Sequence, residues 1–149
     1  MEQRKIAKII VHCSDTPTGR KTTVKDIDDW HKQRGFSKST NGHYCGYHWV
    51  ICVDGVIEMG RLESDIGAHC EGHNSDSIGV CLVGRGEFNR DQFISLFYLL
   101  SDLVVSYNLS VKDVFGHYEL NNKKSCPMIG MNKVREELEK HIQGGFCHE

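Results

Sequence analysis

The sequence predicts a single α/β domain with a mixed central β-sheet and flanking helices. Short apolar runs rich in β-branched residues are typical of buried strands, and longer segments whose apolar residues recur every three or four positions are typical of amphipathic helices. These patterns follow one another in the order β-α-β-β-β-α-β-α, and helices that alternate with strands pack on the sheet. The chain has 149 residues and no internal repeat or linker. We therefore expect one domain over residues 4–142 and a short tail over residues 143–149.

The first two elements are a strand and a helix. Residues 6–11 are mostly apolar and β-branched, which predicts a buried strand with His12 at its C-terminal end. Thr23 followed by Asp26 has the spacing of a capping box, so a helix is expected to begin there. Gly35 is expected to end it.

The middle of the chain predicts a hairpin, a strand and a long helix. Residues 47–53 and 56–59 are β-type runs joined by an Asp-Gly pair, which is a strong hairpin signal. Residues 77–83 read as another buried strand. Residues 91–107 place apolar side chains at i, i+3, i+4 and i+7, as a helix that faces the core does.

The last part of the chain predicts a short strand and a final helix. Residues 111–115 read as the strand and lead directly to His117. Asn132 can cap the helix at its N-terminus. Val134, Leu138 and Ile142 would form the buried stripe of that helix.

Composition excludes several classes of function. Eighteen basic and twenty acidic side chains leave a formal charge of −2. Proteins that bind nucleic acid or anchor to membranes through basic residues usually carry an excess of positive charge, so neither function is expected. The first residues contain too short an apolar run for a signal-peptide core, and no segment approaches the roughly 20 apolar residues of a membrane span. We expect synthesis in the cytoplasm without a signal peptide, where the seven cysteines stay thiols unless a metal or the chemistry uses them.

Two histidines and one cysteine are candidates for a metal site. His12 follows one predicted strand, His117 follows another, and Cys126 lies on the loop after His117, next to Pro127. Three such ligands with an open fourth position are typical of catalytic zinc. Nine histidines are present, so two of them could lie near a cysteine by chance. Spacing alone therefore does not decide whether these three residues form a zinc site or are unrelated polar residues. Lys124 adds a cation that could stabilise a developing oxyanion.

The order of short motifs along the chain resembles a known family. The motifs are IVHCSDT at residues 10–16, GYHWVI at 46–51, DG at 54–55, EMGR at 58–61, GAH at 67–69, GHN at 72–74, SIGV at 77–80, GH at 116–117 and SCP at 125–127. As a set they resemble the zinc-dependent N-acetylmuramoyl-L-alanine amidases of the peptidoglycan-recognition type (type 2), which include small phage lysozymes. The resemblance spans about residues 6–128.

The resemblance implies a fold, a reaction and a ligand set. It implies the single-domain fold of the type 2 amidases and hydrolysis of the amide bond between N-acetylmuramic acid and L-alanine in bacterial peptidoglycan. His12, His117 and Cys126 match the positions of the Zn²⁺ ligands. Activation of water and polarisation of a carbonyl are reactions that zinc performs in such sites.

The same resemblance assigns roles to three further residues. Tyr47 and Lys124 match the catalytic tyrosine and lysine, and His69 matches a position that lines the substrate groove. Without the family, a core aromatic, a solvated loop charge and a surface histidine would be the simpler interpretations. The loop from His117 to Cys126 is one residue longer than in the small phage lysozymes, so Lys123 is a second candidate; counting back from Cys126 favours Lys124.

Two neighbouring residues are expected to stay outside the chemistry. His48 alternates with Tyr47 on its predicted strand and should therefore point to the opposite face, as a hydrogen-bonded core residue. Cys13 follows His12 directly and should point away from it. A Cys/His nucleophile pair needs its side chains in hydrogen-bond reach, so Cys13 is not expected to be a nucleophile.

Three functions are compatible with the resemblance. The first is a monomeric amidase, such as a phage endolysin, that reaches the cell wall after release from the cytoplasm. The second is a non-catalytic peptidoglycan-binding module, but family members of that kind lack the ligand cysteine, which Cys126 supplies here. The third is a regulator that binds a partner such as a polymerase, and no sequence feature tests it.

Overall fold

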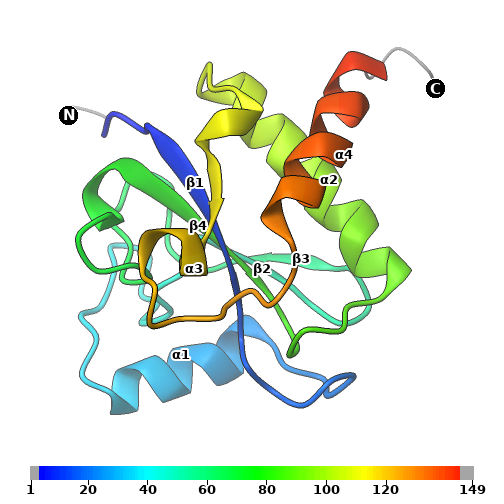
Figure 1. The fold of residues 1–149 in the computed structure, drawn as a ribbon. Helices are drawn as coiled ribbons and strands as arrows, with labels where there is room; N and C mark the ends of the chain where they lie inside the picture. The colour runs from blue at the N-terminus through cyan, green and yellow to red at the C-terminus, as the bar shows by residue number, and fades with distance from the viewer. Residues whose placement is uncertain (1–3, 145–149) are drawn as a thin grey trace.

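The computed structural model describes residues 4–144, and in this range a five-stranded sheet is flanked by helices (Figure 1). The elements are β1 (Lys8–Cys13), α1 (Val24–Gln33), β2 (Trp49–Ile51), β3 (Ile57–Met59), the 3-10 helix η1 (Asn74–Asp76), β4 (Ser77–Leu82), α2 (Arg90–Ser106), the 3-10 helix η2 (Val111–Asp113), β5 (Val114–Gly116), α3 (His117–Leu120) and α4 (Met131–Gly144). The predicted α/β class is confirmed.

The sheet is mixed, as expected. Its strand order is β3-β2-β4-β1-β5. β1 pairs in parallel with both β4 and β5, β4 pairs in parallel with β2, and β3 is antiparallel to β2. The four parallel strands therefore end at the same edge of the sheet, where open α/β sheets bind their ligands.

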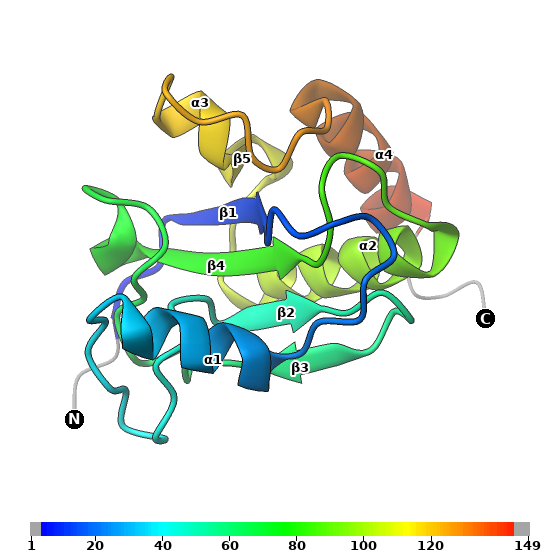
Figure 2. The same ribbon diagram turned by 90° about the horizontal axis from the view of Figure 1, so that it is seen from below.

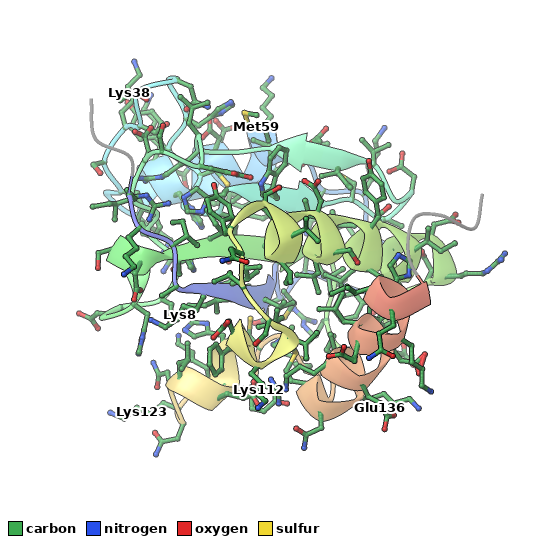
Figure 3. The ribbon with its side chains drawn as sticks, turned by 90° about the horizontal axis from the view of Figure 1, so that it is seen from above. Lys8, Lys38, Met59, Lys112, Lys123 and Glu136 are labelled. Carbon is green, nitrogen blue, oxygen red and sulfur yellow. The ribbon has the colours of Figure 1, made fainter. Side chains whose placement is uncertain are left out.

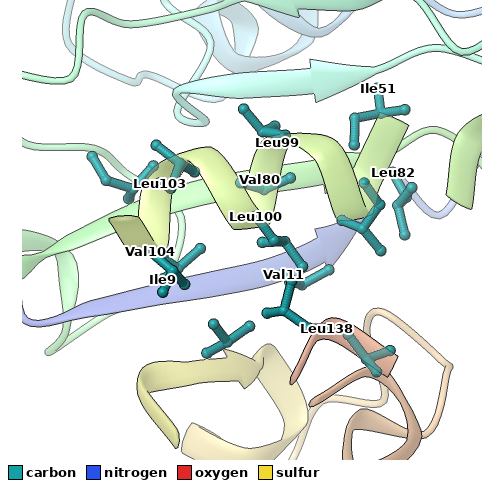
Figure 4. Close-up of a cluster of buried hydrophobic side chains, with 14 of the residues drawn as sticks. Ile9, Val11, Ile51, Val80, Leu82, Leu99, Leu100, Leu103, Val104 and Leu138 are labelled. Atoms are coloured by element: carbon teal, nitrogen blue, oxygen red, sulfur yellow. The ribbon is translucent and has the colours of Figure 1, made fainter. Parts of the chain in front are cut away.

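The two faces of the sheet are covered by different helices (Figure 2). Val80 and Leu82 of β4 belong to the larger hydrophobic cluster, which includes Leu100 of α2 and Leu138 of α4 (Figure 4). Cys81, between them, packs with the α1 side chains on the opposite face. This alternation is the period of two that a strand imposes.

The register decides which face carries the first candidate ligand. His12 is the pairing partner of Cys81 across β1 and β4. Paired residues of neighbouring strands point to the same side of a sheet. His12 therefore lies on the α1 face, away from the larger cluster around α2 and α4.

The predicted helix start is correct for α1, one residue late for α2 and wrong for α4. Thr23 N–H donates to the Asp26 carboxylate at 3.0 Å, as a capping box requires. α4 begins at Met131, so Asn132 lies inside its first turn and is not the N-cap that we expected. The Asn132 side chain instead accepts a hydrogen bond from Arg135 at 2.8 Å.

The predicted strand over residues 111–115 is only half correct. Its first part forms η2, because the Asp113 carboxylate accepts the Ser110 N–H at 3.0 Å and closes a local turn. Only the later part of this segment, Val114–Gly116, forms the strand β5 that pairs with β1. The short helix α3, which directly follows β5, was expected to be loop.

At the C-terminal end, α4 continues to Gly144, two residues beyond the expected end of the domain. Residues 145–149, including Cys147, lie outside the described residues. The six cysteines in the described part are free thiols, as expected. Across residues 4–144, no helix is both long enough and apolar enough to span a membrane.

Candidate active site

A cleft of about 840 Å³ opens beside the C-terminal ends of β1 and β5. Its wall combines the end of β1, the start of α3, the segment around residues 68–74, the end of α1 and the loop over residues 121–128. A cavity of this size can enclose a small-molecule or glycopeptide fragment.

The three candidate ligands meet in this cleft. The ligand atoms of His12, His117 and Cys126 all lie within 4.8 Å of one another. His12 and His117 come together because β1 and β5 are parallel neighbours, and their ring centroids are 4.5 Å apart. Two imidazole nitrogens and one thiol sulfur that converge in this way are a donor set that could hold a zinc ion.

Both imidazoles are held in the neutral form that binds metal. Burial lowers the pKa of His12 well below its ordinary 6.5, and nearby His69, His117 and Lys124 lower it further. Burial likewise lowers the pKa of His117, helped by the Lys124 charge and by His73. A neutral imidazole offers a lone pair to a metal.

Cys126 is held against β1 by the main chain of Cys13. The Cys13 N–H donates to Sγ of Cys126 at 2.9 Å. A hydrogen bond with the Cys13 side chain, together with burial, raises the pKa of the Cys126 thiol. A bound divalent cation would reverse this effect, because a coordinating thiol is deprotonated by the metal charge. Cys13 thus holds Cys126 in place through its main chain.

Tyr47 and Lys124 also line the cleft. The Tyr47 ring centroid is 5.1 Å from that of His12. Burial raises the Tyr47 pKa well above 10, so the phenol keeps its proton. Lys124 is exposed, but its charge reaches both imidazoles. Lys123 also lines the cleft, and in the view of Figure 3 it lies at the edge of the molecule.

His48 is a core residue, as expected. It is fully buried, its Nδ1 accepts the Gly79 N–H at 3.0 Å, and its Nε2 donates to the Asp65 carbonyl at 2.8 Å. Both ring nitrogens are therefore engaged within the fold. His48 is not in the group of potential ligands found among residues 4–144.

His69 lines the cleft but is largely buried in its wall. Only 9% of the residue is exposed, and its Nδ1 lies 2.8 Å from Nε2 of His12. Its main-chain N–H donates to the side-chain oxygen of Asn74 at 2.9 Å. This bond fixes the segment around residues 69–74, which lies next to His12.

Sequence reasoning missed other side chains of the cleft, chiefly His31 and Phe36 at the end of α1. Nδ1 of His31 accepts the Gly46 N–H at 2.8 Å, and burial lowers the His31 pKa to about 4. His31 lies four residues after Ile27, on the stripe that α1 buries. That spacing could have identified it.

Comparisons with known proteins agree with this geometry. Residues 2–129 match the family described as N-acetylmuramoyl-L-alanine amidase. The endolysin of Escherichia phage T7 is 37% identical over 139 residues, covering 88% of this chain and 86% of the endolysin. Among solved structures, the N-acetylmuramoyl-L-alanine amidase endolysin LysCS from Clostridium intestinale superposes with a TM-score of 0.79 at 28% identity, over 91% of this chain and 85% of LysCS. Drosophila PGRP-LB gives a TM-score of 0.68 at 25% identity, over 84% of this chain and 76% of PGRP-LB.

Proposed function

The chain belongs to the N-acetylmuramoyl-L-alanine amidase family, and on that premise we propose that it hydrolyses peptidoglycan with a zinc ion held by His12, His117 and Cys126. Peptidoglycan amidase activity is the function of the family. The dependence on zinc and the roles of individual residues are the parts that we add.

One observation supports the zinc assignment above the others. Two neutral imidazoles and one thiol converge within 4.8 Å at the base of a cleft that is large enough for a muropeptide fragment. A structural zinc site would use a fourth protein ligand, whereas three ligands leave a position for water. Zinc bound there would polarise the amide carbonyl and make water a stronger nucleophile.

Lys124 and Tyr47 have complementary roles in this proposal. The Lys124 ammonium group stabilises negative charge on the carbonyl oxygen as the carbonyl carbon is attacked. Tyr47 keeps its phenolic proton at neutral pH, so its hydroxyl can orient the attacking water or relay a proton. Lys124 is the better candidate than Lys123 because its charge acts on both histidines.

Asp15 and Glu119, two acidic residues near the cleft, do not suit the roles that a glycosidase needs. Such enzymes use two carboxylates, one of them a general acid with a raised pKa. Here Asp15 is paired with Arg85 at 2.8 Å. A hydrogen bond from Arg135 lowers the pKa of Glu119. Neither carboxylate has the environment of a general acid.

The biological setting follows from the relatives. The phage endolysins among them support a role in cell-wall degradation. We expect the domain over residues 4–142 to act as a monomer on bacterial peptidoglycan once it has reached the wall, without nucleic acid or membrane as partner.

The bond that is cleaved can be identified from the products. Purified cell walls should be digested with the zinc-loaded protein, and new L-alanine amino termini and new reducing sugar ends should both be measured. We expect amino termini and intact glycan strands. Reducing ends without amino termini would exclude an amidase, and binding without either product would indicate a recognition module.

A further inference from the structure

The His69 ring packs against two glycines, at positions where any larger residue would clash with the ring. A Cβ atom added at Gly79 would lie 2.7 Å from Cγ of the His69 ring, and one added at Gly67 would lie 2.6 Å from its Cδ2. Real side chains do not approach so closely. Gly67 and Gly79 thus leave the space that the His69 ring fills.

The ring joins His12 to a buried serine. Nδ1 of His69 is 2.8 Å from Nε2 of His12, and Nε2 of His69 is 3.2 Å from Oγ of Ser77. His12 is 1% exposed and Ser77 is fully buried, so water does not compete strongly for these bonds. The three side chains form one hydrogen-bonded chain that leads away from the cleft.

A metal on His12 would determine the direction of these hydrogen bonds. Nε2 of His12 lies 2.8 Å from Nδ1 of His69, so a metal would bind His12 through Nδ1. A metallated Nδ1 carries no proton, so the neutral ring holds its proton on Nε2 and donates it to His69. Nδ1 of His69 must then be an acceptor, so Nε2 of His69 carries the proton and donates to Ser77.

We propose that His69 is a positioning residue, which through its bond to Ser77 fixes the tautomer and the ring orientation of His12 so that Nδ1 faces the zinc ion. Partners of this kind orient metal-bound histidines and raise their basicity, and losing one typically weakens metal binding by about 10- to 100-fold. This inference rests on the proposed zinc function. It gives His69 a role that differs from the groove contact implied by the family resemblance.

Two substitutions of nearly equal shape separate the hydrogen-bonding role of His69 from its packing role. His69→Asn keeps an acceptor oxygen near the place of Nδ1, whereas His69→Leu replaces it with a methyl group. Ser77→Ala removes the far acceptor and leaves His69 in place. Zinc affinity of the full chain should be measured by competition with a chromophoric chelator, and the Nε2 proton of His12 should be followed by ¹⁵N-edited NMR in the zinc-loaded form.

We expect His69→Leu to weaken zinc binding by about 10- to 100-fold and His69→Asn by only a few-fold, with Ser77→Ala between them. The Nε2 proton of His12 should exchange faster in His69→Leu. Zinc affinity that is the same in His69→Leu and the parent would overturn the inference, as would weaker muropeptide binding at unchanged zinc affinity. If His69→Leu does not fold, the ranking of the parent, His69→Asn and Ser77→Ala decides. A parent that binds no zinc would overturn the proposed function as well, so the two failures are distinguishable.

Discussion

Substitution of Gly79 by alanine should weaken the zinc site from a position that is not itself a proposed metal ligand. The new Cβ would lie 2.7 Å from Cγ and 2.8 Å from Cδ2 and Nδ1 of the His69 ring. Favourable carbon contacts begin near about 3.5 Å, so the ring or the strand must move by about 0.8 Å. A shift of that size is large enough to stretch the 2.8 Å bond to His12 beyond hydrogen-bonding distance.

The expected magnitude follows from this clash. Overpacking of a tight core typically costs about 1 to 3 kcal/mol. For a domain of this size, each kcal/mol lowers the melting temperature by about 2 to 4 °C. Gly79→Ala should therefore melt several degrees below the parent. Its zinc affinity should fall by about the factor expected for losing the His69 partner, roughly 10- to 100-fold.

The assay pairs thermal unfolding with chelator competition. Gly130→Ala is the matched control, because a Cβ there meets no atom within 4 Å, and it should behave as the parent does. Adding His69→Ala to Gly79→Ala relieves the clash. The double variant should regain part of the lost melting temperature but not zinc affinity, a non-additivity that reports direct contact. Parent-like zinc affinity in Gly79→Ala would refute the reasoning, even if the protein were less stable.

Four further predictions concern the proposed chemistry and the core. Cys126→Ala should lose bound zinc and activity, and zinc retained in this variant would contradict the ligand assignment. The protein without metal should stay largely folded by circular dichroism, because a domain of this size has a sufficient hydrophobic core. Lys124→Ala should lower kcat by about 10² or more with little change in muropeptide affinity, while Lys123→Ala should leave kcat nearly unchanged. The reverse result would assign the catalytic role to Lys123. Tyr47→Phe should lower kcat by a similar factor while elemental analysis finds unchanged zinc. Burial lowers the His48 pKa from 6.5 to about 4, so the free energy of unfolding should decrease as the pH falls from about 6.5 to about 4; an equally steep decrease in His48→Gln would assign the effect to other groups.

The family motifs and the hydrophobic periodicity predicted most of the fold. The mixed sheet, α1, the hairpin of β2 and β3, β4 and α2 all follow from patterns that extend over a few neighbouring residues. In the segment expected to be a strand over residues 111–115, a local side chain outweighed the pattern, because Asp113 closes a turn there. α4 begins one residue before its expected N-cap, Asn132.

The sequence by itself determined which residue types are available for the chemistry, because strand ends, the loop after His117 and the order of motifs are local or linear properties. The family resemblance implied that His12 and His117 lie together, but only the tertiary structure shows how they meet, through the parallel pairing of β1 with β5. It also decided that His69 lies against His12 in a slot between glycines. Strand order and side-chain packing join residues that are distant in the chain, and a local pattern contains no information about such contacts.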